Sequence, residues 1–222
     1  MKIFIVYAHH EQKSFNNAMF QTAVKTFTNA GHTVRVSDLY AMQFNPVSDH
    51  TNFLQLKNPS FLKQQLEELH ATAVKGFSKA IDEEQEKLEW CDLLILQFPL
   101  WWFGLPGILK GWVDKVFAMG RIYGQGRVYE QGVMKGKRAL LSLTTGGTKE
   151  SYLADGVNGD LAGILRPIHR GVLEFTGFSV LAPQVVYGPV RQSKLELENE
   201  LLAWSNRLQI ISAESAIEVG RY

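Results

Sequence analysis

A loop rich in aromatic side chains is the part of the sequence best suited to holding a flat ligand. It runs from Phe98 to Gly104 and contains Trp101, Trp102 and Phe103 directly after an apolar run. Loops that follow buried strands are usually polar, because their backbone must be hydrated. Indole and phenyl rings placed there can stack on a heteroaromatic system such as isoalloxazine, whose polar edge the loop backbone can bind. The same rings would also suit an aromatic minicore or a dimer patch.

A second candidate binding segment follows the first apolar run, at His9 and at Ser14, Phe15 and Asn16. The last three residues begin a helical pattern, and the free N–H groups and positive dipole end of a helix N-terminus can bind phosphate. His9 could add a hydrogen bond. Taken alone, the segment favours the simpler role of Ser14 as a helix N-cap. The GxGxxG spacing of dinucleotide-binding folds is absent from this loop.

A third candidate loop is Thr144-Thr145-Gly146-Gly147. Its small residues let backbone donors approach a ligand closely. Glycine is also common in ordinary turns between a strand and a helix, so the motif is weak by itself. If the three loops meet at one place, each supplies a part of a flavin site, and together they predict one.

The composition excludes several other kinds of chemistry. Among 222 residues, 23 basic and 22 acidic side chains give a net charge of +1, which argues against a nucleic-acid-binding surface. Cys91 is the only cysteine, so an intrachain disulfide and a CxxC redox or zinc site are excluded. The hydrolase signatures GxSxG and HExxH are absent. Because 45% of the residues are apolar, we expect a large core, with Cys91 inside it.

Strand-like and helix-like segments alternate along the sequence. Segments rich in apolar and β-branched residues predict strands at Ile3–Ala8, Thr33–Val36, Leu93–Phe98, Ala139–Leu143 and Ser179–Val186. Helical spacing predicts helices over Phe15–Phe27, much of Ser60–Glu89, a segment starting at Pro106, Leu161–Phe175 and Lys194–Ile211. We expect a long polar loop from Tyr40 to Asn58, and an exposed helix face over the acidic run Asp82–Glu89.

Apolar strands separated by helices predict a parallel sheet covered on both faces. Five such strands favour a flavodoxin-like α/β fold, with a five-stranded parallel sheet of order 2-1-3-4-5, in which the three candidate loops meet at the carboxyl edge. We expect one domain over residues 1–222 and a cytoplasmic location. No membrane insertion is expected, because the longest apolar stretch, Leu93–Leu109, is interrupted by prolines, glycines and Gln97.

Collinear motifs that include these loops resemble a known enzyme family. They are Ala8-His9 with Ser14-Phe15-Asn16, Ser37-Asp38-Leu39-Tyr40-Ala41-Met42, Gln97-Phe98-Pro99-Leu100 with Trp102-Phe103-Gly104, Ile108-Leu109-Lys110-Gly111-Trp112, and Thr144-Thr145-Gly146-Gly147. From about residue 2 to residue 187 the sequence resembles the NAD(P)H:quinone oxidoreductase (DT-diaphorase-like) family. The resemblance implies a homodimer with active sites at the subunit interface, non-covalently bound FAD, and two-electron ping-pong reduction of quinones by NAD(P)H.

The resemblance also assigns roles to individual residues. The expected FAD contacts are His9, Phe15, Asn16, Leu100, Trp101, Trp102, Phe103, Thr144, Thr145, Gly146, Gly147 and Tyr152. Tyr123 and Phe175 are expected on the substrate side of the flavin ring, and Tyr152 and Asn158 are the expected catalytic residues. A tyrosine hydroxyl near the N1–C2=O edge can stabilise the negative charge that the ring gains with the hydride.

Three features depart from parts of the family. Asn158 stands where one branch has histidine and matches the shorter, ribosylnicotinamide-preferring branch; it can hydrogen-bond but cannot become a cation. The metal site of that second branch is not expected, because Arg170 and Glu174 replace its two histidines. The arginine that approaches the adenine of FAD has no clear counterpart, and Arg191 or Lys194 is the candidate to replace it.

Two other functions remain open for this sequence. A flavodoxin-type electron carrier would bind FMN and pass single electrons to a protein partner, but such carriers are usually shorter and strongly acidic. A regulatory flavoprotein subunit of a potassium-efflux system also resembles this family. Copurification with a membrane transporter would favour that second alternative.

Overall fold

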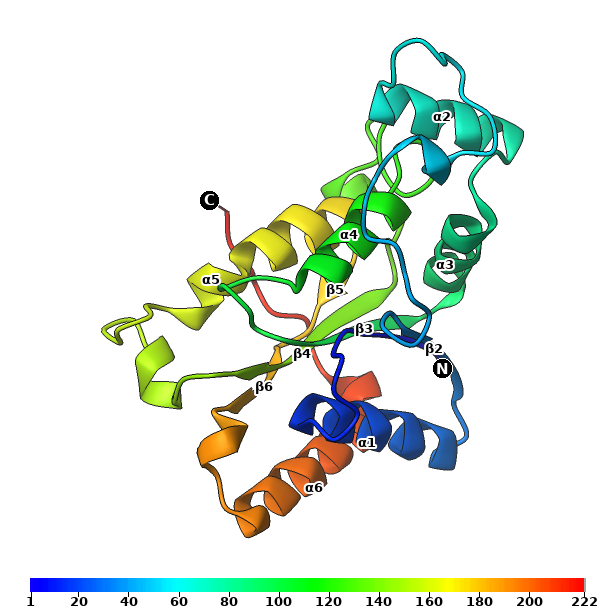
Figure 1. Cartoon of the computed structure of the whole chain (residues 1–222). Coiled ribbons are helices and arrows are strands. Elements are labelled where there is room, and N and C mark those ends of the chain that lie inside the picture. The colour runs from blue at the N-terminus through cyan, green and yellow to red at the C-terminus, as the bar shows by residue number, and fades with distance from the viewer. Residues whose placement is uncertain (222) are drawn as a thin grey trace.

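A parallel sheet forms the centre of the computed structural model, which describes residues 1–221. Its strands are β1 (Lys2–Tyr7), β2 (Thr33–Asp38), β3 (Leu93–Pro99), β4 (Arg138–Thr145), β5 (Ser179–Val180) and β6 (Gln184–Tyr187). The strand order is β2-β1-β3-β4-β5, β6 also pairs with β4, and all these pairings are parallel. The predicted flavodoxin-like fold is therefore confirmed (Figure 1).

The predicted fifth strand, Ser179–Val186, differs from the prediction because it is divided in two. β5 pairs with Arg138 and Ala139 of β4, whereas β6 pairs with residues 142–145 of the same strand. Pro183 lies between the two segments and has no N–H group to donate to the ladder. Within residues 1–221 the sheet therefore contains six strands rather than five, and β5 and β6 lie on the same side of β4.

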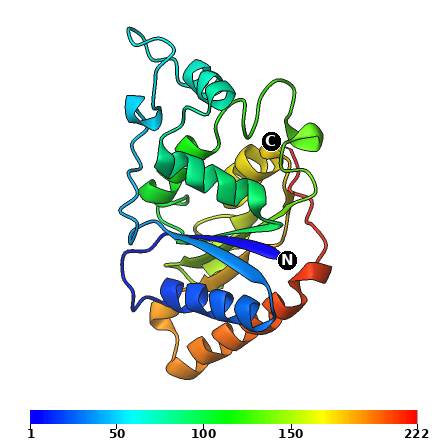
Figure 2. The same cartoon turned by 90° about the vertical axis from the view of Figure 1, so that its right-hand side faces the viewer.

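Helices cover both faces of the sheet, as expected. α1 (Phe15–Asn29) and α6 (Lys194–Ile210) pack on one face, and α3 (Lys79–Trp90), α4 (Gly107–Val116) and α5 (Leu161–Ile168) pack on the other (Figure 1, Figure 2). α2 (Gln64–Val74) lies farther from the sheet. A π-helical turn, His169–Glu174, continues α5, so the predicted helix Leu161–Phe175 is present but irregular. Over residues 1–221, no helix is both long and apolar enough to cross a membrane.

Successive residues of the central strands face two separate cores. Phe4 of β1 packs on the side that holds Trp112 of α4, whereas Ile5 packs on the side that holds Met19 of α1 and Trp204 of α6. Side chains of a strand alternate between the two faces of its sheet, so a strand covered on both faces is apolar at most positions. This requirement explains why the central strands could be predicted from apolar runs.

One acidic residue predicted to lie on an exposed helix face is instead fully buried. Glu84 of α3 accepts hydrogen bonds from Trp112 Nε1 at 2.8 Å, Ser37 Oγ at 2.9 Å and Lys87 Nζ at 2.5 Å. A carboxylate can be buried where donors of this kind compensate its lost hydration. The expectation that the whole run Asp82–Glu89 is exposed was therefore wrong at Glu84, which joins α3 to α4 and β2.

The long loop between Tyr40 and Asn58 packs directly on α4. A Cβ atom at Gly111 would lie 2.3 Å from the carbonyl oxygen of Pro46, so this contact requires glycine. Lys115 Nζ donates to the carbonyl oxygens of Asn45 and Val47 at 3.0 and 3.1 Å. These contacts fix α4, whose N-terminal end follows the aromatic loop.

Candidate functional site

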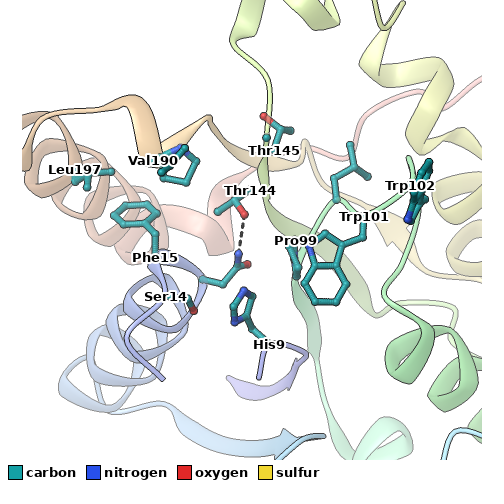
Figure 3. Close-up of a pocket in the computed structure, with 14 residues that line it drawn as sticks. His9, Ser14, Phe15, Pro99, Trp101, Trp102, Thr144, Thr145, Val190 and Leu197 are labelled. Atoms are coloured by element: carbon teal, nitrogen blue, oxygen red, sulfur yellow. Dashed lines mark hydrogen bonds between the residues drawn. The ribbon is translucent and has the colours of Figure 1, made fainter. Parts of the chain in front are cut away.

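The three predicted binding loops meet at the carboxyl edge of the sheet. A cavity of about 530 Å³ lies there, next to the ends of β1, β3 and β4 (Figure 3). It is lined by His9, Ser14, Phe15, Asn16, Pro99, Leu100, Trp101, Trp102, Thr144, Thr145, Gly146, Pro189, Val190 and Leu197. The structure thus brings most of the residues predicted to contact a flavin to one cavity wall. Of the predicted set, Phe103, Gly147 and Tyr152 lie outside this lining.

The N-terminus of α1 supplies hydrogen-bond donors to the cavity wall. Ser14 is the N-cap: its Oγ accepts from the Asn17 N–H at 3.1 Å, and its carbonyl oxygen accepts from the Ala18 N–H at 3.1 Å. Considering the residues that the structure describes, the N–H groups of Phe15 and Asn16 have no acceptor. Free first-turn donors and the positive helix end suit an anion such as phosphate.

His9 adds a neutral donor to the same wall. Its Nδ1 accepts a hydrogen bond from the Glu11 N–H at 3.0 Å. Burial, and next the neighbouring His10, lower the pKa of His9 from its ordinary value. A neutral imidazole that accepts at Nδ1 carries its proton on Nε2, so Nε2 can donate to a ligand. The His9 ring lies 5.9 Å from the Trp101 ring, centroid to centroid (Figure 3).

The aromatic loop adopts a backbone conformation that glycine and asparagine normally occupy. Trp102 and Phe103 have φ angles of 50° and 57°, and the Gly104 N–H bonds to the Trp101 carbonyl oxygen at 3.0 Å. Two positive φ angles inside such a hydrogen bond are the pattern of a type I′ turn. For residues other than glycine, the left-handed conformation costs about 1–2 kcal/mol each and is typical of functional positions.

This turn holds three aromatic rings away from the core. Trp102 is 97% exposed, Phe103 50% and Trp101 39%. Trp101 lies toward His9, whereas Trp102 projects farther out (Figure 3). A strained turn that holds large apolar rings in solvent indicates that the rings are covered when the protein functions, either by a ligand or by a second chain.

The end of β4 connects the other two loops. The Leu100 N–H bonds to the Thr144 carbonyl oxygen at 2.8 Å, and Asn16 Nδ2 donates to Thr144 Oγ1 at 2.6 Å (Figure 3). Thr145 Oγ1 donates to the Gly147 carbonyl oxygen at 2.8 Å, which shapes the turn after the strand. The relative positions of the three loops are therefore set by direct hydrogen bonds.

Tyr152 and Asn158 cluster at one glycine beside the cavity. A Cβ atom at Gly147 would lie 3.1 Å from Tyr152 Cε2 and 3.4 Å from Asn158 Nδ2. The Asn158 N–H bonds to the Ser151 carbonyl oxygen at 2.9 Å, which fixes its backbone. Gly147 directly follows Gly146, which lines the cavity. The two predicted catalytic side chains therefore lie together and next to the cavity wall.

The two predicted substrate residues lie in a different cavity. Tyr123 and Phe175 have ring centroids 5.6 Å apart and line a hollow of about 470 Å³ that shares no lining residue with the first cavity. Gln65 Nε2 donates to the Tyr123 hydroxyl at 3.2 Å, and burial raises the pKa of Tyr123. Within one chain, the structure does not bring these residues to the flavin-type cavity.

The outer end of the first cavity is apolar. Val190 and Leu197 line it, whereas Arg191 and Lys194 do not. Arg191 Nη1 instead donates to the Gly146 carbonyl oxygen, and Lys194 forms an exposed ion pair within α6. The roles of Val190 and Leu197 were not predictable from the sequence, because the pairing of β6 with β4 brings the segment that follows β6 to the cavity.

Four titratable residues outside the cavity, Arg170, Glu174, His169 and Cys91, are paired or buried. Arg170 pairs with Glu174 at 2.9 Å, and its guanidinium lies 4.0 Å from the centroid of the Tyr129 ring. Burial lowers the pKa of His169 to about 4 and raises the pKa of Cys91 to about 12. The buried, apolar role predicted for Cys91 is confirmed. Within residues 1–221, no group of three or more His, Cys, Asp and Glu side chains could hold a metal ion.

Comparison with known proteins identifies the class and then the family. A family model described as the flavodoxin-like fold matches residues 1–208. The chain is 45% identical over 217 residues to ribosyldihydronicotinamide dehydrogenase [quinone] of Rattus norvegicus, covering 97% of this chain and 94% of the relative. It is 42% identical over 215 residues to NAD(P)H dehydrogenase [quinone] 1 of Cavia porcellus, covering 96% and 78%.

A solved structure agrees with these relatives. It is a Klebsiella pneumoniae protein assigned as a quinone reductase, 39% identical, with a TM-score of 0.94 over 98% of this chain and 87% of that one. The chain belongs to the quinone oxidoreductase family of flavodoxin-like proteins. The family predicted from the sequence motifs is thereby confirmed.

Proposed function

We propose that this protein is an FAD-dependent quinone reductase that takes hydride from a reduced nicotinamide. The observation that carries the proposal is one cavity bounded by a helix N-terminus with free donors, an aromatic loop and a threonine- and glycine-rich loop. Relatives named as quinone dehydrogenases support the same activity. When bound, a flavin supplies two-electron chemistry, so that hydride from the nicotinamide reaches the quinone in two half-reactions of a ping-pong cycle.

The chain's own residues have distinct roles in this proposal. The Phe15 and Asn16 N–H groups hold a phosphate, and Trp101 packs along the flavin ring. The loop that starts at Thr144 binds the polar edge of the ring through backbone donors. Tyr152 donates a hydrogen bond to the oxygen on which negative charge develops during hydride transfer, and neighbouring Asn158 orients the donor or the ring.

The apolar outer end of the cavity supports FAD rather than FMN. Val190 and Leu197 follow the phosphate-type end of the cavity and offer a surface on which an adenine can pack. We expect the flavin-free protein to bind FAD more tightly than FMN, and the difference to persist at high salt because no charge produces it. Leu197→Asp should reduce FAD affinity to the level of FMN and leave FMN affinity unchanged. Equal affinities for both flavins in the unmodified protein would contradict this assignment.

The separate position of Tyr123 and Phe175 supports a homodimer. A second copy could place its Tyr123–Phe175 hollow over the exposed turn at Trp102, so that each active site uses both chains. The strongly exposed Val157, which directly precedes Asn158, would be covered by the same contact. Size-exclusion chromatography with light scattering should give twice the 25.1 kDa mass of one chain. A monomer that retains full quinone reductase activity would rule out a site shared between subunits.

Anaerobic spectroscopy tests the proposed activity directly. The purified protein should carry a visible flavin absorbance, which NADH, NADPH or a ribosyl dihydronicotinamide bleaches and which menadione restores under argon. Comparing the three donors also identifies the preferred nicotinamide. A protein that purifies colourless and binds no added flavin would refute the proposal.

A further inference from the structure

A chain of buried polar side chains underlies the cavity. Gln97 Nε2 donates to Asn16 Oδ1 at 2.9 Å, and Asn16 Nδ2 donates to Thr144 Oγ1 at 2.6 Å, the bond drawn dashed in Figure 3. The three residues are 1%, 4% and 6% exposed, respectively. Asn16 and Thr144 line the cavity, but Gln97 does not. Gln97 can therefore influence a bound ligand only through the other two side chains.

Polar residues also flank Gln97 on the neighbouring strands. Gln97 of β3 is in register with Tyr7 of β1 and Ser142 of β4, and all three are buried. In the part of the chain that the structure describes, Gln97 Oε1, Ser142 Oγ and Tyr7 OH have no hydrogen-bond partner. Burying such groups costs free energy that an apolar strand would avoid. Their presence beneath the cavity therefore points to a role in the site above them.

The hydrogen bonds of this chain have a direction. An amide accepts only at its oxygen and donates only from its nitrogen. When the NH₂ group of Gln97 faces Asn16, Asn16 must turn its oxygen to Gln97 and its own NH₂ group to Thr144. The Thr144 hydroxyl then accepts from Asn16, and its proton is available to the cavity. If Gln97 turned over, each bond would reverse and Thr144 would present a lone pair instead.

We infer that Gln97 is a positioning residue which, through Asn16, makes Thr144 a hydrogen-bond donor to the ligand. The site then selects a ligand that places an acceptor, either a phosphate oxygen or a flavin oxygen or ring nitrogen, against Thr144. Asn16 lies at the positive end of α1, which also favours an electron-rich acceptor atom on the ligand. Met19 supports the orientation, because its Sδ, an acceptor only, lies 3.9 Å from Gln97 Nε2 and accepts from it. The inference rests on the proposed function in taking a flavin as the ligand.

Two substitutions at Gln97 test the direction of the chain. Gln97→Met keeps the size of the side chain but removes both polar groups, and should weaken binding of at least one flavin by about ten-fold. An ionised Gln97→Glu carboxylate can only accept, so it should reverse the chain and weaken binding further. Once protonated, that carboxyl can donate to Asn16 again. Flavin affinity of Gln97→Glu should therefore recover as pH falls, relative to the unmodified protein at each pH.

The measurement is the dissociation constant of riboflavin, FMN and FAD, from quenching of flavin fluorescence by the flavin-free protein. Losses confined to FMN and FAD identify phosphate as the acceptor at Thr144, and equal losses for all three place the acceptor on the riboflavin portion. Either pattern supports the inference. If Gln97→Met does not fold, the flavin dissociation constants of Gln97→Glu at different pH values still test the inference.

Gln85 provides matched controls. It is also fully buried, but its Nε2 donates to the Val116 carbonyl oxygen at 3.1 Å and its Oε1 accepts from Arg121, away from the cavity. Gln85→Met and Gln85→Glu should lower thermal stability without changing flavin affinity or its pH dependence. Unchanged affinities in both Gln97 variants, or the same pH-dependent recovery in Gln85→Glu, would overturn the inference. An unmodified protein that binds none of the three flavins would instead refute the proposed function.

Discussion

Trp112 and Trp102 lie ten residues apart in the sequence and in opposite environments. Trp112 has no exposed surface, bonds through Nε1 to Glu84 at 2.8 Å, and packs against the rings of Phe4 and Phe117. Trp102 is 97% exposed and has a φ angle of 50°. The first indole gains burial and a hydrogen bond on folding, whereas the second gains neither and strains its backbone.

The contrast shows how to separate packing residues from site residues within one aromatic cluster. Burial with a satisfied N–H group explains Trp112 completely, so it needs no ligand. Exposure combined with a disfavoured backbone conformation opposes stability, and such positions are concentrated at functional sites. Substitution of Trp112 should therefore change the free energy of unfolding, whereas substitution of Trp102 should change binding at the site.

The largest expected effect is a loss of stability when the buried Trp112 is replaced. Trp112→Ala should lower the free energy of unfolding by about 3–5 kcal/mol, because it leaves a cavity. It also removes one donor from the buried Glu84 carboxylate. Urea denaturation followed by circular dichroism measures the change, with Trp102→Ala as the control that should stay near the unmodified value. A loss below about 1 kcal/mol in Trp112→Ala would show that the distinction is wrong.

A pH dependence should follow from another buried residue, His169. Its pKa is lowered by burial to about 4 in the folded protein, against about 6.5 in an unfolded chain. Between pH 6.5 and pH 4 the unfolded state binds the proton and the folded state does not, so stability should fall as pH falls. The expected loss is about 3 kcal/mol by pH 4. Denaturation midpoints of His169→Gln should fall less steeply over this range, and equal slopes would exclude His169 as the cause.

Tyr152→Phe should change catalysis rather than stability. The variant lacks the hydroxyl that is proposed to stabilise the negative charge developing on the flavin. Flavin reduction should therefore slow about ten-fold, while FAD stays bound. Stopped-flow absorbance under argon measures the rate constant, and the flavin content of the purified variant is the control. Unchanged reduction kinetics would remove Tyr152 from the proposed mechanism.

The smallest expected effect on stability is at Trp102. Trp102→Gly should leave the free energy of unfolding unchanged or raise it by up to about 1 kcal/mol, because glycine adopts positive φ without strain. The KM for menadione should rise, since a wall of the site is lost. Trp102→Phe retains a ring at this position and should show a smaller rise. A destabilisation as large as that of Trp112→Ala would assign Trp102 to the core.

Most of the fold was predictable from the sequence because burial on both faces makes the strands continuously apolar. Two details were not. The break between β5 and β6 depends on Pro183, which lies within an apolar run whose pattern continues through it. The burial of Glu84 depends on donors from Ser37 and Trp112, which are distant in sequence. The burial of Glu84 therefore has no local signature, whereas Pro183 is a local signal that the apolar residues on both sides of it outweighed in the prediction.

The residues of the candidate site that lie in the three predicted loops could be predicted from the sequence. His9, Asn16, Trp101 and Thr144 lie on the cavity wall because strand order alone brings the ends of three strands together. The left-handed turn was not predicted, since such turns are normally marked by asparagine or glycine rather than by Trp102-Phe103. The contribution of Val190 was also missed, because an apolar loop residue has no recognisable binding pattern.

The interruption of the sheet beside β4 has a consequence for how copies of the chain can associate. A long, open edge strand is a template for a strand of another molecule. Here β5 has two residues and β6 four, and the Ile217 N–H bonds to the Val180 carbonyl oxygen at 2.8 Å, so the segment after α6 already lies against β5. This edge is short, broken and partly occupied. Addition of a foreign strand is disfavoured there, which protects the sheet from edge-to-edge aggregation and leaves contacts on this side to helices and loops.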